Sequence, residues 1–405
     1  LKMFPKENFV LILGAGITGL SAINYLKGKK NFKIFDTRNI HKLPLDFVND
    51  ESIKTNLISL KDLNFELIEY VICSPGFDYD HEIIQQLKKN NISIKSDIEI
   101  FVEENNSKKI LVSGTNGKTT VSLLLERIIS LSGLDSYAIG NLGRPVLDYI
   151  ELEKDYFIIE VSSFHLQISN NLNADIAILL NISHDHLDRH KSFENYVNIK
   201  NSLFGKCKVS IGNKNDKNIK RGLTSYFEGS EKIDDANLNA VSKVLEKIDL
   251  NCSQEELKKF SFKPNHRMEV FHEDKLGRKF INDSKATNCG ATISAIKSLK
   301  NEKIIIICGG QGKGADFSEL TSEIDKKCEA VIIYGEDKKQ IGSKVKTCNK
   351  HYVNNLKEAI SKALNLSKSK FTILFSPACA SFDMFNNFEE RGEEFKRLIL
   401  NEGNT

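Results

Sequence analysis

The stretch Ser113-Gly-Thr-Asn-Gly-Lys-Thr-Thr120 decides the fold of the middle of this chain. It ends a strand-like run, KILVSG, and its Lys118 opens a helix that we expect to reach about Ser132. The amides of such a glycine-rich turn can cradle phosphate, the lysine can reach the terminal phosphates, and Thr119 can bind Mg²⁺. The full phosphate-loop pattern needs glycine where Val112 stands, but the placement between strand and helix still favours phosphate binding over a chance Gly-Lys-Thr.

Length and composition indicate several domains and no strongly charged surface. A chain of 405 residues is long enough for two or three domains. A net charge of +3 gives no support for nucleic-acid or membrane partners, and the eight cysteines lack zinc-site spacing, which favours reduced thiols. The first residues show no signal-peptide pattern, and no apolar run approaches the ~18 residues of a membrane span. We therefore expect a cytoplasmic protein and, as its assembly, a monomer.

Short β-branched runs alternate with helical segments, which predicts three tandem α/β units with parallel sheets. Residues 1–96 contain the runs NFVLILGAG, FKIFD, YVICSPG and ISIKSDIEIF, with a helix from about Thr18 to Gly28. Residues 97–263 contain the phosphate loop, the strands YFIIEVS and ADIAILLNIS, and a polar tail suited to helices. Residues 264–405, starting near Pro264, contain KFIND, KIIIICGG, EAVIIYG and KFTILFSPA.

A second glycine-rich turn, Gly14-Ala-Gly-Ile-Thr-Gly19, follows the first strand and opens a helix. Asp36 ends the next strand, about 20 residues on, as in the dinucleotide-binding fingerprint. By itself this turn leaves three interpretations open: NAD, another nucleotide, or a tight turn that binds none.

Acidic residues and histidines follow the strands beside the phosphate loop. Glu160 ends YFIIE, where a carboxylate can bind Mg²⁺, although a solvated strand-end glutamate is the alternative. The next strand ends in Asn181-Ile-Ser-His-Asp-His-Leu-Asp-Arg-His190, in which three histidines are interleaved with acids. This density favours a metal or anion site.

The third unit carries further candidate anion-binding groups. Arg267 can fork onto a phosphate or carboxylate. Lys285 and Thr287 could hold another anion, with an exposed polar helix start as the alternative. The turn Gly309–Gly314 follows a buried strand, whereas periodicity reads residues 376–392 only as a loop and a partly buried helix.

Taken in order, these segments resemble the Mur ligase family along nearly the whole chain. NDSKATN, GGQGKGADFS and SPACASFDMFNNFEERG are the discriminating pieces, and they are most similar to the branch of the family that adds D-glutamate. The resemblance implies a Rossmann-like N-terminal domain for a UDP sugar, a central P-loop-type ATPase domain and a Rossmann-like C-terminal domain for the amino acid. The implied reaction joins D-glutamate to UDP-N-acetylmuramoyl-L-alanine with ATP, through an acyl phosphate, in peptidoglycan precursor synthesis.

The same resemblance implies roles for individual residues. Lys118, Glu160, His186 and Lys200 would be catalytic. Two Mg²⁺ ions would be held by Thr119 and Glu160 and by His186 with Lys200, if that lysine is carbamylated. The implied ATP contacts are Gly114, Thr115, Asn116, Gly117, Lys118, Thr119, Thr120, Asn239, Arg267 and Asp283. Those for the UDP sugar are Ile17, Thr18, Asp36, Thr37, Arg38, Ser74, Pro75, Gly76, Asn141 and His186. Those for D-glutamate are Lys285, Thr287, Lys313, Ser381 and Phe388.

Two positions depart from the family pattern. His165 stands where many relatives have Gln, and Ala236 stands where an Asn preceding Asn239 is expected. The alternatives to a D-glutamate ligase are a sister or folylpolyglutamate-type ligase, an NAD-dependent oxidoreductase built on the first glycine turn, and a nucleotide sensor without turnover. The last of these is disfavoured because Lys118, Glu160 and Lys200 are all present.

Overall fold

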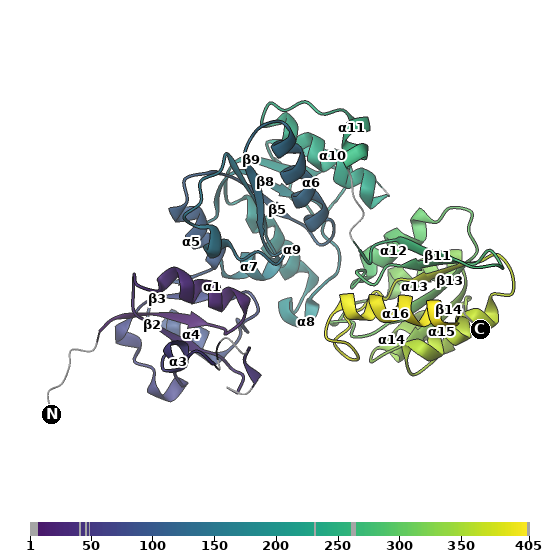
Figure 1. The fold of residues 1–405 in the computed structure, drawn as a ribbon, viewed down its shortest axis with the longest axis horizontal. Helices are drawn as coiled ribbons and strands as arrows, with labels where there is room; N and C mark the ends of the chain where they lie inside the picture. Colours follow the sequence, from purple (N-terminus) through teal and green to yellow (C-terminus); the bar gives the residue numbers. More distant parts are fainter. Residues whose placement is uncertain are drawn as a thin grey trace.

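The computed structural model describes residues 7–39, 42–44, 47, 49–230, 232–260 and 265–402. Three α/β domains follow one another along the chain, each on its own sheet (Figure 1). The predicted start of the third unit at Pro264 lies outside the described residues. Every helix in the described part of the chain is too short or too polar to cross a bilayer.

The N-terminal sheet has the strand order β2-β1-β3-β4 and is parallel throughout. Its strands are β1 (Phe9–Leu13), β2 (Phe32–Phe35), β3 (Ile68–Cys73) and β4 (Ile94–Lys95). Alternate residues of β1 pack to opposite sides, Leu11 against α4 (Glu82–Lys89) and Ile12 against α1 (Ile17–Leu26). Because helices cover both faces, these strands read as continuous apolar runs. Short helices α3 (Glu51–Lys54), η2 (Leu60–Asp62) and η3 (Phe65–Leu67) complete the domain.

The prediction that ISIKSDIEIF is one strand is wrong beyond its first residues. Only Ile94–Lys95 pair with β3, and Asp97–Glu104 form helix α5. Ser96 caps this helix by accepting a hydrogen bond from the Glu99 amide at 3.0 Å. Ser-x-x-Glu before an apolar run is a capping-box sequence, and this local signal outweighs the β-branched isoleucines.

The central sheet is parallel throughout, with the order β10-β9-β8-β5-β7-β6. Ile110 and Val112 of β5 pack toward α6 and α10, and Leu111 packs toward α7 and α9. The strands are β5 (Lys108–Ser113), β6 (Ser136–Gly140), β7 (Tyr156–Glu160), β8 (Asn173–Leu179), β9 (Lys206–Asn213) and β10 (Ser225–Phe227). The helices are α6 (Lys118–Leu131), η4 (Val146–Tyr149), α7 (Ser163–Ile168), α8 (Leu187–His190), α9 (Phe193–Asn201), η5 (Ser202–Phe204), α10 (Ile233–Glu246) and α11 (Gln254–Phe260).

The C-terminal sheet has the order β11-β12-β16-β13-β14-β15, and only the edge strand β11 is antiparallel to its neighbour. Its strands are β11 (Glu269–Glu273), β12 (Lys279–Asn282), β13 (Ile304–Gly309), β14 (Cys328–Tyr334), β15 (Asn349–Tyr352) and β16 (Thr372–Phe375). Ile306 of β13 packs toward α12 and α13, whereas Ile307 packs toward α15 and α16. The helices are α12 (Cys289–Ser298), α13 (Ser318–Lys327), α14 (Lys338–Lys344), α15 (Leu356–Leu366) and α16 (Phe388–Glu402).

Candidate functional site

The loop between β5 and α6 is held in the shape of a phosphate cradle. Gly114 and Gly117 have φ of +155° and +89°, which side chains rarely allow. The loop is pinned by Asn181 after β8, which accepts the Thr115 amide through its carbonyl and the Asn116 amide through its side chain, each at 2.9 Å. Lys118 Nζ donates to the Gly114 and Thr115 carbonyls at 2.9 Å, and burial lowers its pKa. The lysine thus lies inside the curve of its own loop.

A cavity of about 460 Å³ opens over this loop and is shared by two domains. The central domain contributes the phosphate loop with Asn141, Glu160, Asp185 and His186. The C-terminal domain contributes Arg267, Lys285, Thr287, Asn288 and Phe388. Three of the four residues predicted to be catalytic, Lys118, Glu160 and His186, and three of the five predicted for D-glutamate, Lys285, Thr287 and Phe388, therefore meet in one place.

Glu160 has a free carboxylate oxygen at the edge of the cavity. Its Oε1 accepts a hydrogen bond from Asn141 Nδ2 at 2.8 Å, whereas the buried Oε2 has no hydrogen-bond partner in the part of the chain that the structure describes. A buried, unpaired carboxylate oxygen beside the hydroxyl-bearing Thr119 fits a Mg²⁺ ligand. No group of three or more His, Cys, Asp or Glu side chains with metal-ligand placement occurs in the described residues. A divalent ion here would therefore need Thr119, substrate oxygens or a modified lysine as additional ligands.

His186 lines the same cavity as the phosphate loop. Its backbone has a φ of +53°, and its ring packs edge-on against Phe164 with centroids 4.8 Å apart. Burial lowers the pKa of His186 to about 4, against the opposing effect of Asp185. The imidazole is therefore neutral near pH 7 and keeps a lone pair for a cation or a hydrogen-bond donor.

Lys200 of α9 is buried beneath the phosphate loop. Its Nζ donates to Gly114 O at 2.9 Å and to Ser113 Oγ at 3.2 Å, and its residue is 1% exposed. Burial, followed by the neighbouring Lys118, places the pKa of Lys200 well below its usual value. A buried amine with a depressed pKa is nucleophilic near neutrality, which is the property that carbamylation by CO₂ requires.

A set of polar contacts closes the C-terminal domain onto the central one. Lys313 Nζ forms an ion pair with Asp185, and both side chains are nearly buried. Asn288 Nδ2 donates to Asp185 Oδ2 at 3.1 Å, and the Asn288 and Asn116 amides exchange two hydrogen bonds at 3.1 and 3.2 Å. We call Asp185, Lys313, Asn288 and Asn116 the closure contact. The sequence predicted no individual role for Asp185 or Asn288, although Asn288 heads a helix with a typical N-cap residue.

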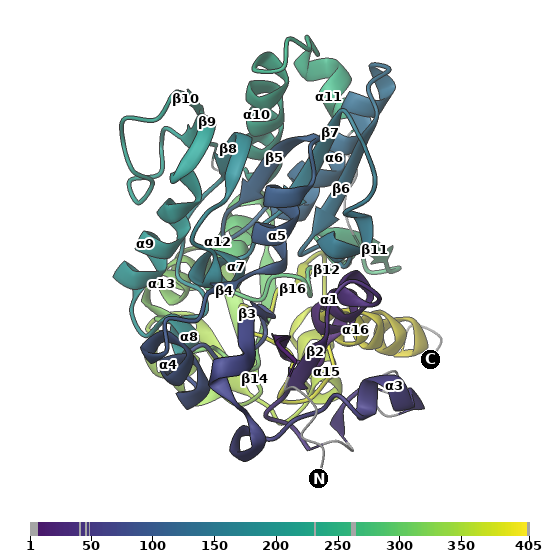
Figure 2. The same cartoon turned by 90° about the vertical axis from the view of Figure 1, so that its left-hand side faces the viewer.

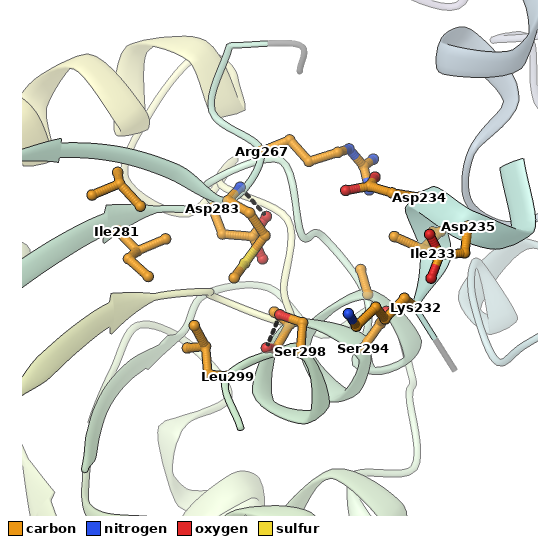
Figure 3. A pocket seen from close by; sticks show the side chains of 14 residues that line it. Lys232, Ile233, Asp234, Asp235, Arg267, Ile281, Asp283, Ser294, Ser298 and Leu299 are labelled. Atoms are coloured by element: carbon orange, nitrogen blue, oxygen red, sulfur yellow. Dashed lines mark hydrogen bonds between the residues drawn. The ribbon is translucent and has the colours of Figure 1, made fainter. Parts of the chain in front are cut away.

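Figure 3 shows a second cavity, of about 380 Å³. Arg267 lines both cavities, and its buried Nε has no hydrogen-bond partner among the described residues. Asp283 accepts the Met268 amide at 3.1 Å and the Ser376 hydroxyl at 2.7 Å, and burial raises its pKa to about 6. The other walls are apolar side chains of the C-terminal domain and the first residues of α10: Ile281, Leu299, Ile233, Asp234 and Asp235.

Asn239 and Ser381, both predicted site residues, line neither cavity. Asn239 points to the outer side of α10, where its Nδ2 donates to the Glu228 carbonyl at 2.8 Å. Asn237 is the buried asparagine of this helix, and its amide lies where a Cβ on Gly117 would be. Ser381 is buried but does not line the cavity. Sequence alone could not distinguish the two asparagines, because which of them faces the phosphate loop depends on the rotation of α10 about its axis.

Except for Asn141 and His186, which line the cavity of the central domain, the predicted UDP-sugar residues belong to the N-terminal domain, in its glycine turn and in the segments after β2 and β3. Asp36 Oδ2 accepts the Ala15 amide at 2.6 Å, and Arg38 grips the same carboxylate with Nε and Nη2 at 2.9 and 2.8 Å. Burial alone would raise the pKa of Asp36, but these partners lower it. Ser74 Oγ donates to Gly14 O at 3.3 Å, and Ile17 is 71% exposed. Thr18, Thr37, Pro75 and Gly76 belong to the same segments.

The fold and site define a three-domain α/β enzyme that binds a nucleotide by its phosphates and brings a second α/β domain over them. Family models agree with this organisation along the chain: the Mur ligase MurD-like N-terminal domain over residues 8–96, the Mur ligase middle domain over 112–286 and the glutamate ligase domain over 266–379.

Full-length relatives give the same result. The chain is 31% identical to a UDP-N-acetylmuramoylalanine–D-glutamate ligase of Caldanaerobacter subterraneus, covering 98% of each chain. It is 34% identical to the protein of that name in Francisella tularensis, covering 97% of this chain and 96% of the relative. A MurF ligase structure from Thermotoga maritima in complex with ADP covers 98% of this chain and 95% of its own at a TM-score of 0.62 and 13% identity, which is a likeness of fold. The chain belongs to the Mur ligase family, the ATP-dependent ligases of peptidoglycan synthesis.

Proposed function

We propose that this chain joins D-glutamate to UDP-N-acetylmuramoyl-L-alanine at the expense of ATP. The observation that carries the proposal is the shared cavity, which places the phosphate loop and Glu160 opposite Lys285, Thr287 and Phe388 of the C-terminal domain. An amide-forming ligase needs this arrangement, because an activated carboxylate on one side must meet an amine delivered from the other.

In this proposal ATP spans both cavities. Its phosphates lie on the loop from Gly114 to Thr120, and its adenosine lies in the second cavity beyond Arg267 (Figure 3). Arg267 lines both cavities, and its free Nε supports a contact to the phosphates. We place Asn237 rather than Asn239 beside the phosphate loop, because Asn237 is the one that abuts Gly117.

The first chemical step brings two anions together, the γ-phosphate and the alanine carboxylate. Lys118 and Arg267 supply positive charge, and the partly desolvated cavity strengthens their effect. Thr119 and Glu160 would hold one Mg²⁺, which when bound neutralises charge on the phosphate oxygens. The carboxylate displaces ADP from the γ-phosphorus, and the product is an acyl phosphate with a better leaving group than the free acid.

In the second step the D-glutamate amine attacks the acyl carbon and phosphate leaves. Lys285 is placed to bind one carboxylate of the amino acid, with its ammonium 5.5 Å from the Phe388 ring centroid. Lys313, now paired with Asp185, would take the other carboxylate, and Thr287 and Ser381 would complete the pocket. The attacking nitrogen loses a proton in this step, and the departing phosphate can accept it.

Four finer points belong to the same proposal. Lys200 is carbamylated and, with His186, holds a second Mg²⁺. The enzyme works as a monomer in the cytoplasm. It has no nucleic-acid or membrane partner. The domains divide near residues 96 and 263. The support for the carbamate is the buried amine of Lys200 under the phosphate loop, where burial lowers its pKa well below the usual value.

Phosphate release from ATP tests the proposal directly. Turnover should require both UDP-N-acetylmuramoyl-L-alanine and D-glutamate, and L-glutamate, L-alanine or meso-diaminopimelate should not replace the latter. Phosphate release that does not depend on D-glutamate would contradict the ligase proposal. Preference for another amino acid would identify a sister ligase, and failure to bind ATP with Mg²⁺ would revive an NAD-dependent enzyme.

A further inference from the structure

Arg189 is a cation near the site to which the proposed reaction gives no role. It lies on α8, three residues after His186, in the region where the central domain approaches α4 of the N-terminal domain (Figure 2). Its guanidinium lies over the Phe164 ring, 4.9 Å from the centroid, and its Nε donates to Gln167 Oε1 at 3.1 Å. Both partners belong to α7, so the guanidinium is held in one orientation by the central domain.

Nη2 of this side chain is buried and has no hydrogen-bond partner among the residues that the structure describes. Asp80, a nearby acid, pairs instead with the exposed Lys191 at 3.1 Å. Burial lowers the pKa of Arg189, and the opposing effects of Asp78, Cys73, Asp80 and Asp188 do not offset it. A guanidinium does not deprotonate in proteins, so a fixed positive charge lies at this position without a close counter-ion. Such an arrangement is costly unless a ligand completes it.

The nucleotide turn of the N-terminal domain is close to this charge. Cys73, one of the electrostatic neighbours of Arg189, ends β3, and the next residue, Ser74, donates its hydroxyl to Gly14. Gly14 begins the glycine turn whose amides can face phosphate oxygens. The arginine on the N-terminal side, Arg38, is already neutralised by Asp36. The turn therefore offers amides to a diphosphate but draws little net positive charge from Arg38.

We propose that Arg189 binds the diphosphate of the UDP-sugar substrate and supplies, from the central domain, the positive charge that the N-terminal glycine turn lacks. This rests on the proposed function, in which the UDP sugar lies on that turn with its alanyl end at the catalytic cavity. Binding by Arg189 would have a second effect, because a diphosphate held by both domains fixes the distance between the nucleotide turn and His186.

The test compares UDP with uridine, which lacks the phosphates, on the full-length protein. Calorimetry with UDP, and competition against UDP for uridine, should show that Arg189→Gln weakens UDP binding about 10- to 100-fold, since it removes a charge-assisted pair. Uridine affinity and ATP affinity should stay unchanged. In turnover, KM for the UDP sugar should rise while KM for ATP does not. Lys191→Gln is the matched control, because it removes a neighbouring positive charge that is exposed, and it should alter UDP affinity less than about twofold.

Arg189→Lys keeps the positive charge but loses the two parallel N–H donors of the guanidinium. This variant tests the proposal if Arg189→Gln does not fold. Its UDP affinity should fall several-fold. Unchanged UDP affinity in a variant that still binds ATP would overturn the proposal. So would an equal loss of uridine and UDP, which would make Arg189 a support for domain packing. A wild-type protein that neither binds UDP nor turns over would instead contradict the proposed function.

Discussion

At the scale of single residues, the site depends on charges that the fold keeps unpaired. Glu160 Oε2, Arg267 Nε and Arg189 Nη2 are buried without hydrogen-bond partners, although most buried polar atoms in proteins have one. Glu160 and Arg267 line the cavities, and Arg189 follows the cavity residue His186 on α8, so a ligand could supply the missing partner of each. Unsatisfied groups of this kind cost stability, so their position supports binding chemistry over a structural role.

Lys200 gives the first prediction. Lys200→Ala should lower kcat at least about 100-fold, because it removes the side chain that would carry the second metal-binding carboxylate, a loss of the size seen for electrostatic groups in active sites. Formate or acetate should restore part of the activity, since a small carboxylate fits the space left by the carbamate. Phosphate release with increasing formate measures this.

The control for that rescue is Lys109, another buried lysine, whose ammonium binds the Asn105 and Ser107 carbonyls far from the phosphate loop. Lys109→Ala should lower the stability of the protein. Formate or acetate should not restore any phosphate-release activity that this variant loses. Loss of activity in Lys200→Ala without any rescue would favour a plain structural role for its ammonium group.

His190 gives a prediction about pH. It is fully buried, its Nδ1 has no partner, and burial lowers its pKa to about 4. The unfolded chain takes up this proton near pH 6.5, and the folded chain takes it up only near pH 4. The contribution of His190 to the free energy of unfolding is therefore fully present above pH 6.5 and is lost as the pH falls from 6.5 to 4. The full effect is up to about 3 kcal/mol. Urea unfolding followed by circular dichroism at pH 7.5 and 5 should show a smaller pH dependence for His190→Leu than for wild type. An identical dependence in the two proteins would show that His190 does not titrate between the states.

The placement of a residue at the site was predictable where a short sequence pattern fixes it, and not where three-dimensional geometry does. Lys118 in its glycine turn and Glu160 at its strand end both line the cavity, as their sequence positions indicated. Asn237 and Asn239 both occur near the start of α10, but only the rotation of the helix shows that Asn237 faces Gly117. Asp185 likewise gained its partners only when Lys313, distant in sequence, was brought to it.

At the scale of elements, the sequence predicted strands better than their ends. The central strands, buried on both faces, are long apolar runs and were placed correctly. The segment ISIKSDIEIF was not, because Ser96 caps a helix within an apparently strand-like run. Contacts between elements could not be predicted from the sequence either. The packing of α10 against the start of α6 is such a contact, and it matters for function.

Gly117 tests that packing. Gly117→Ala should abolish measurable ATP binding, because a Cβ would overlap the Asn237 amide and a positive φ strains alanine. Gly133→Ala is a matched control, since Gly133 also has a φ of +89° but has nothing within 4 Å of its Cβ position. It should bear only the backbone strain, about 1 kcal/mol of stability. Calorimetric titration with ATP measures both variants. Equal ATP affinities in the two variants would show that the packing of α10 does not determine the conformation of the phosphate loop.

At the scale of the molecule, the two domains around the cavity are joined by groups that also belong to the site. Asp185 holds Lys313 and Asn288, and Asn288 holds the phosphate-loop residue Asn116. The closure contact therefore links the nucleotide loop to the amino-acid domain directly. Because Lys313 is proposed to bind a D-glutamate carboxylate, substrate would compete with Asp185 for the same ammonium, and binding would replace one interdomain contact with another.

Asn288 offers the cleanest test of this closure, because it can be altered without removing its helix cap. Asn288→Ser keeps an N-cap acceptor for the Ala291 amide but is too short to reach both Asp185 and Asn116. Losing a hydrogen bond to a charged group should cost roughly tenfold in kcat/KM for D-glutamate, with a larger radius of gyration for the ligand-free protein in small-angle X-ray scattering. Asn355→Ser makes the same change at the exposed cap of α15, distant from the cavity, and should affect neither quantity. If Asn288→Ser matched Asn355→Ser in both measurements, the closure contact would not hold the domains together, and closure would have to come from the substrates alone.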